Sequence, residues 1–381
     1  MKSSEPVRDQ VKADSDLITP PGAARLWSWK ALVCWAVVAV LAVLVFATAE
    51  KNGPVSADNR NPGGADKPLP VEPLWSVIDW LTVGQVLGLV LFIAVVIACV
   101  RGWRRHPGHP VILMVLATST LLWVDPYNNW AIGLVYNPKL WHFPRDWPWL
   151  NLSPVIEPLT SFVYAPYILL PYFVVMPILR AVQRRRGPDA FVWRHPLISL
   201  GVLTFVFGAI WDALLEIFLV QTQFLTYTHV VEFGSINAGE NTQFPMLWAS
   251  VLITIVMIPA SLLLYRDDTG RSQAEKIARR FRFHDRRPKL ATFLVMAITL
   301  SVMMFSFSSA FWVLRATGAA STVACPWPYP TAKTWDPHGY YESEGAPGPF
   351  TAGAGSTWQI GQPEGRPTHI VPESQRCNPD N

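Results

Sequence analysis

The stretch LISLGVLTFVFGAIWDALLEIFLV, residues Leu197–Val220, decides the fold. At about 1.5 Å per residue, a helix of this length spans the roughly 30 Å hydrocarbon core of a bilayer. The only charged side chains within it are Asp212 and Glu216. The segment therefore predicts a membrane-spanning helix that carries two carboxylates into the lipid.

Six further apolar runs satisfy the same length rule. They are approximately Ala31–Ala49, Leu81–Val100, Pro110–Val124, Leu159–Val182, Met246–Tyr265 and Leu290–Leu314. Over the whole chain 51% of residues are hydrophobic and 15% are charged, against about a quarter charged in soluble proteins. We predict an all-α integral membrane protein, a bundle of about seven transmembrane helices. The first run is interpreted as a retained helix, because a long polar segment precedes it.

The distribution of Lys and Arg predicts the orientation. With the amino terminus inside, the segments 1–30, 101–109, 180–194 and 266–289 are cytoplasmic and hold 22 of the 31 basic residues. This predicts an N-in, C-out protein of the plasma membrane. The formal charge of +4 is then a topology signal, so no nucleic-acid partner is expected. Within 266–289, the stretch Gln273–Phe283 suggests a helix on the inner surface.

The ends of the chain differ in composition from the bundle. We predict a disordered cytoplasmic amino terminus over 1–25, a membrane domain over 26–315 and an extracytoplasmic tail over 316–381 that is rich in Pro and Gly. Cys325 and Cys377 both fall in that tail, on an oxidising side where disulfides persist. Either they form a disulfide or they are two free thiols.

Polar residues of several helices are predicted to gather at one level, near the outer face. Asp212 and Glu216 stand four apart on one helical face, and like charges so close favour one carboxylate that keeps its proton. Such a pair is suited to general acid–base chemistry, and Glu157 and Asp125 complete the catalytic candidates. The substrate-binding candidates are Tyr127, Asn128, Asn129, Tyr164, Tyr167, Trp211 and His229. The alternative is that Asp212 and Glu216 only hydrogen-bond helices together.

Several kinds of chemistry lack their motif in this sequence. The run Leu290–Leu314 contains no lysine for a retinal Schiff base, and no pair of histidines lies within the predicted helices for haem. There is also no Walker loop, no dinucleotide glycine motif and no helical His-Glu-x-x-His for zinc. We therefore predict chemistry without a cofactor and without a metal.

Three short clusters carry a resemblance to a known family. They are Asp125-Pro-Tyr-Asn-Asn, Glu157-Pro and Trp211-Asp-x-x-x-Glu216. With the size and the helix count, they make residues 75–315 resemble the membrane spirocyclases of the AveC type, named from avermectin biosynthesis in actinobacteria. The resemblance implies closure of a dihydroxy-ketone to a spiroketal, in some members with dehydration. It assigns no catalytic residue here.

Two hypotheses of different classes remain open at this point. The first is a cyclase/dehydratase that acts by general acid–base catalysis on a lipophilic hydroxy-ketone such as a polyketide, sterol or lipid. The alternative is a non-enzymatic lipid- or sterol-binding protein, or an accessory subunit of an envelope transport complex. We expect membrane lipids and a lipophilic small-molecule substrate as partners. An accessory subunit would instead mainly dock a protein, and the sequence names no protein partner.

Overall fold

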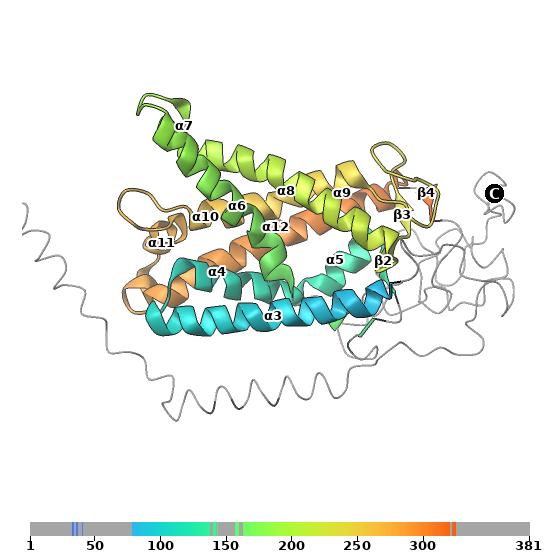
Figure 1. Cartoon of the computed structure of the whole chain (residues 1–381), viewed down its shortest axis with the longest axis horizontal. Helices are drawn as coiled ribbons and strands as arrows, with labels where there is room; N and C mark the ends of the chain where they lie inside the picture. Colours follow the sequence, from blue (N-terminus) through green and yellow to red (C-terminus); the bar gives the residue numbers. More distant parts are fainter. Residues whose placement is uncertain are drawn as a thin grey trace, which may run out of the picture.

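The computed structural model describes residues 78–137 and 163–320, the short pieces 140–141, 143, 157–159 and 322–324, and three single residues near position 36. Long helices lie side by side in a bundle, and the short strands gather at one end of it (Figure 1). We call this end the sheet end. The opposite end, where the short helix α11 (Gln273–Ala278) lies, is called the α11 end.

Five helices in the described part are long and apolar enough to cross a membrane. They are α3 (Trp80–Arg105), α6 (Tyr164–Arg185), α8 (Pro196–Gln221), the pair α9 (Met246–Leu252) and α10 (Thr254–Leu264), and α12 (Pro288–Ala316). The predicted helical membrane protein is thus confirmed. The predicted first helix, Ala31–Ala49, lies outside the described residues except for Val33, Ala36 and Val40, which are helical. The count of seven stays a prediction.

The third predicted helix is broken. The chain runs through α4 (Pro110–Ser119) and the 3-10 turn η2 (Thr120–Trp123), then bends by 57° into α5 (Asp125–Ile132). The predicted run Pro110–Val124 agrees with α4 and η2, but the sequence analysis did not predict the helix α5 that follows it. A straight helix through Pro126 would lose a backbone donor and place the ring against the carbonyl four residues earlier. The chain therefore bends and restarts, and α5 is almost wholly buried.

The exposed fractions of its side chains show that α3 lies at the surface of the bundle. Only Gln85 is buried on α3, whereas apolar side chains such as Leu87 and Val90 are exposed, as expected of a surface against lipid. The core centres on α10, which packs against α4, α6, α8, α11 and α12. The inner face of α12 packs against α4, α5, α10 and α11, and its Met296 and Leu300 are fully buried there.

Two small antiparallel sheets cover the sheet end. β1 (Leu134–Tyr136) pairs with β2 (Leu225–Tyr227), and β3 (His229–Val230) pairs with β4 (Thr322–Val323). These strands lie between or beyond the predicted helices, and the all-α prediction did not include them. The side-chain amide of Gln243 donates to the carbonyl of Tyr227 at 2.8 Å and so ties the segment before α9 to β2.

The α11 end carries most of the basic residues of the bundle. A capping box formed by Ser272 and Glu275 begins α11, and Phe281 beyond its end is exposed. The short helices α7 (Phe191–Arg194) and η5 (Arg282–Asp285) also lie here. The N-in orientation stays a prediction. The predicted ends 1–25 and 325–381, with Cys325 and Cys377, lie outside the described residues.

Candidate active site

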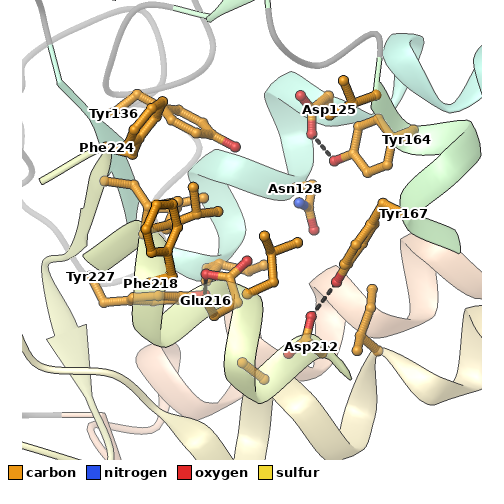
Figure 2. Close-up of a pocket in the computed structure, with 18 of the residues that line it drawn as sticks. Asp125, Asn128, Tyr136, Tyr164, Tyr167, Asp212, Glu216, Phe218, Phe224 and Tyr227 are labelled. Carbon is orange, nitrogen blue, oxygen red and sulfur yellow. Dashed lines mark hydrogen bonds between the residues drawn. The ribbon is translucent and has the colours of Figure 1, made fainter. Parts of the chain in front are cut away.

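A cavity of about 300 Å³ lies inside the bundle toward the sheet end. Its walls come from α3, α5, α6, α8, α9, α12 and the strands β1 and β2. Its polar lining residues are Asp125, Asn128, Tyr136, Tyr164, Tyr167, Asp212, Glu216 and Tyr227. Figure 2 shows these side chains turned toward a common space from opposite walls. The remainder of the lining is apolar, including three phenylalanine rings.

Each of the three carboxylates in the cavity accepts a hydrogen bond from a tyrosine. Tyr164 of α6 donates to Asp125 at the start of α5. One turn further along α6, Tyr167 donates to Asp212 of α8. The third bond, from Tyr227 of β2 to Oε2 of Glu216, is 3.0 Å long. Three segments far apart in the sequence thus bring three phenol–carboxylate pairs to one cavity.

The pair on α8 has the arrangement that its spacing predicted. Asp212 and Glu216 lie one helical turn apart, both line the cavity, and their charges interact. Asp212 is buried, whereas Glu216 is partly open to the cavity. The pair therefore places two carboxyl groups on one wall of the cavity, where one can serve as an acid and the other as a base.

Two carboxylate oxygens beside the cavity have no hydrogen-bond partner among the described residues. They are Oδ2 of Asp125 and Oδ2 of Asp212, on side chains whose other oxygen accepts from a tyrosine. Leaving a buried acceptor unsatisfied costs about 1–3 kcal/mol. Asp125 and Asp212 therefore each keep a buried acceptor in the wall of the cavity.

Helix α12 holds α5 in place through polar contacts. The hydroxyl of Ser308 donates to Oδ1 of Asn128 at 2.8 Å, and Ser309 is 2.9 Å from the hydroxyl of Tyr127. At the other end of α5, Arg315 donates to the carbonyls of Trp130 and Ala131. These contacts satisfy backbone groups that a broken helix leaves without partners inside a membrane.

Tyr136 of β1 extends its hydroxyl into the cavity from the sheet end (Figure 2). Burial, and next the charges of Asp125 and Glu157, raises the pKa of this phenol well above its usual value. Burial and then Glu216 do the same to the pKa of Tyr227. Both phenols therefore keep their protons at neutral pH and serve as hydrogen-bond donors.

The structure brings six of the predicted site residues to the cavity. They are Asp125, Asn128, Tyr164, Tyr167, Asp212 and Glu216. Five others lie behind its wall or away from it: Tyr127, Asn129, Glu157, Trp211 and His229.

Each of those five has a described contact. Asn129 donates to Glu157 at 3.0 Å, and the indole of Trp211 donates to the carbonyl of Tyr167 at 3.3 Å. His229 is buried on β3 with Nδ1 at 2.9 Å from Thr228. These residues support the cavity wall or the sheets and do not line the cavity itself.

Two lining tyrosines were missed in the sequence. Tyr136 and Tyr227 lie between predicted helices, and neither is among the predicted site residues. The signal that was present is the pattern of β-branched and aromatic residues in Leu134–Tyr136 and Leu225–Tyr227, which favours strands. Prediction of a strand pair at the sheet end would have placed these two phenols beside the carboxylates.

No group in the described part of the chain has three His, Cys, Asp or Glu side chains placed to hold a metal ion. The three cavity carboxylates are each held by a different tyrosine and so are separate from one another. The prediction of chemistry without a metal or cofactor remains a prediction.

One comparison with known proteins gives a match. The family described as Spirocyclase AveC-like matches residues 103–335. This range includes the broken helix, all three carboxylates of the cavity and both tyrosine-bearing strands. No curated protein and no solved structure matches the chain.

Proposed function

The chain belongs to the AveC-like spirocyclase family, and we propose that it is a membrane-embedded cyclase/dehydratase for a lipophilic hydroxy-ketone. The observation that carries the proposal is the cavity in which Asp125, Asp212 and Glu216 each meet a tyrosine. The cavity is otherwise apolar, which suits a substrate such as a polyketide, sterol or other lipid. We place the protein in the plasma membrane.

Spiroketal closure requires a proton donor and a proton acceptor at each step. A protonated carboxyl of the Asp212–Glu216 pair donates to the ketone oxygen, while one substrate hydroxyl attacks the carbonyl carbon and gives its proton to the other carboxylate. The product of this step is a hemiketal, and both carboxyls have exchanged protonation states. Net proton count is unchanged, so the pair is ready for the second closure.

The second closure passes through a cation. Protonation of the hemiketal hydroxyl releases water and leaves an oxocarbenium ion, which the second substrate hydroxyl attacks. The last proton returns to a carboxylate. In sum, one dihydroxy-ketone gives one spiroketal and one water. Carboxylates in an apolar cavity stabilise the developing positive charge, and the hydroxyl of Tyr136 supplies a donor for a substrate oxygen.

The cavity also holds a flexible substrate in a reactive conformation. A chain with two hydroxyls must bring both to the same carbonyl carbon, and holding it in that geometry replaces a large entropic part of the barrier. We assign this positioning to Asn128 and to the apolar walls. Asp125, on the opposite wall from Asp212 (Figure 2), is assigned to the second hydroxyl.

Amide variants of the α8 pair test the proposal. Asp212→Asn and Glu216→Gln keep shape and hydrogen bonding but remove the titratable proton. We expect normal amounts of protein in membranes and a loss of product by roughly 10²–10⁴, the usual contribution of an acid or base. Complementation of a deletion strain, with mass spectrometry of extracted lipids and polyketides, measures this. Asp189→Asn, an exposed carboxylate on the other side of the bundle, is the matched control.

A purified-protein assay complements the cell experiment. A symmetrical nine-carbon ketone with a hydroxyl at each end closes to a chiral spiroketal, and uncatalysed closure gives both hands equally. We expect the protein to produce an excess of one hand. Full rescue by both amide variants in cells would contradict the enzyme and favour a binding or accessory role.

A further inference from the structure

We propose that the cavity is a binding site for lipophilic ammonium ions, and that such amines inhibit the protein. Binding is inferred from the charges and free acceptors of the cavity. Inhibition rests in addition on the proposed function. The ligand class is an amine whose protonated nitrogen carries alkyl groups of a size that fits about 300 Å³.

The charge of the described lining is one-sided. Three carboxyl groups line the cavity, and none of the described residues that line it is Lys, Arg or His. Arg315 of α12, which is buried, donates instead to the carbonyls at the far end of α5. A cation is therefore attracted by whichever of these carboxyl groups are ionised, whereas an anion is repelled.

The hydrogen-bond geometry offers places for the N–H groups. In the described part of the chain, Oδ2 of Asp125 and Oδ2 of Asp212 have no hydrogen-bond partner, and these two residues are 0% and 2% exposed. Tyrosine hydroxyls occupy the other oxygens. An ammonium N–H bonded to a carboxylate is a charge-assisted hydrogen bond, about twice as strong as a neutral one. A ligand donor would thus satisfy acceptors that the protein leaves open.

Aromatic rings complete the environment of an organic cation. Phe218, Phe224 and Phe307 line the cavity beside the tyrosines, and a cation over an aromatic face gains about 0.5–2 kcal/mol. The same rings pack against the alkyl part of the ligand. A bare metal ion lacks such an apolar part, and the described residues offer it no cluster of three ligands. The environment therefore favours an alkylated ammonium ion over an inorganic cation.

The inhibition follows from the charge of the intermediate. The oxocarbenium ion is positive at the carbon that both hydroxyls attack, and a site that accelerates its formation binds that charge more tightly than the neutral ketone. A protonated cyclic amine has a positive nitrogen in a six-membered ring of similar size. It should compete with substrate at the same carboxylates.

The test measures binding to the purified full chain in a nonionic detergent. The probe is N-octylpiperidine at neutral pH. Octyl tetrahydropyran is the uncharged analogue of matched shape, and decanoate is the anionic control. Isothermal titration and thermal unfolding are the readouts. We expect the amine to bind at least tenfold more tightly than the uncharged analogue, and decanoate to give no shift of Tm.

Variants locate the site. Asp212→Asn and Asp125→Asn should each weaken amine binding about tenfold and leave binding of the uncharged analogue unchanged, while Asp189→Asn should change neither. The Tm of each variant without ligand shows that it is folded. Equal affinity for the amine and its uncharged analogue, or unaltered amine binding in both Asp variants, overturns the inference.

The two proposals fail separately. Selective amine binding without formation of any spiroketal would sustain the ammonium site and contradict the enzyme. Turnover of the symmetrical ketone without selective amine binding would sustain the enzyme and contradict the ammonium site.

Discussion

Tyr167 on α6 donates a hydrogen bond to Asp212 on α8, and the bond lies at the wall of the cavity. The same tyrosine accepts, through its backbone carbonyl, a bond from the indole of Trp211. The two helices are thus joined twice at neighbouring residues. The orientation of Asp212 therefore depends on α6 as well as on its own helix.

Tyr167→Phe removes the hydroxyl and keeps the ring. A hydrogen bond to a charged group contributes about 1.5–3 kcal/mol, which corresponds to about 10-fold to 150-fold in rate. We expect product formation to fall within that range while protein levels stay normal. Tyr172→Phe, on the same helix but not among the cavity residues, is the control. Equal activity of the two variants would show that the bond is structural only.

Gly84 of α3 touches the ring of Phe224, and a Cβ built there would lie 2.2 Å from Cζ of that ring. Gly84→Ala therefore forces the ring to move, and both residues line the cavity. Overpacking of this kind costs about 1–3 kcal/mol. We expect a lower Tm, or a lower affinity for bulky ligands if the ring moves into the cavity.

Gly201→Ala is the matched control for this substitution. Gly201 also lies within a membrane-spanning helix, and its Cβ would be 3.8 Å from Ile258, an ordinary contact. Here the helix gains about 0.5–1 kcal/mol from alanine. A comparison of Tm between the two variants separates steric conflict from the general effect of glycine in a helix. An equal rise in both would contradict the steric argument.

Arg315→Met leaves the carbonyls of Trp130 and Ala131 without their described donor. Each unsatisfied buried carbonyl costs about 1–3 kcal/mol, so we expect a large loss of thermal stability. Arg315→Lys should restore part of it, because one ammonium can still reach a carbonyl. Arg194→Gln, in an exposed ion pair with Asp189, should change the free energy of unfolding by less than about 1 kcal/mol. A stable Arg315→Met protein would exclude the capping role.

Fusions of a reporter enzyme test the orientation. With the amino terminus inside, a reporter after Asn381 should be active outside the cytoplasm, and a reporter after Arg271 should be active inside. The physical reason is the excess of Lys and Arg on one side of the predicted bundle. Activity of the Asn381 fusion inside the cell would reverse the topology and place the cavity near the cytoplasmic face.

The sequence was sufficient for the helices and for the acidic residues. Length and hydropathy located α3, α6, α8 and α12 within a few residues, because a spanning helix must be long and apolar. The spacing of Asp212 and Glu216 placed both at one cavity. Asp125 also reaches that cavity, as the first residue of α5, a helix that the sequence analysis did not predict.

The tertiary partners could not be predicted in the same way. Pro126 signals a break, but the direction of α5 after the bend depends on Ser308, Ser309 and Arg315, which lie about 180 residues away. Tyr227 reaches Glu216 only because β2 pairs with β1. Long-range contacts of this kind carry no local sequence signal. For this reason the sequence analysis expected His229 at the cavity and did not expect Tyr136 there.

The position of α12 late in the chain has a consequence for biosynthesis. Met304 and Phe307 close one wall of the cavity, and α12 follows every other described long helix in the chain. Synthesis proceeds from the amino end, so the acidic residues of α5 and α8 enter the bilayer before the helix that encloses them. A nascent chain that stops before Pro288 already carries all three acids but lacks the donors that hold α5. Its exposed polar groups make that intermediate a natural client of membrane chaperones and proteases.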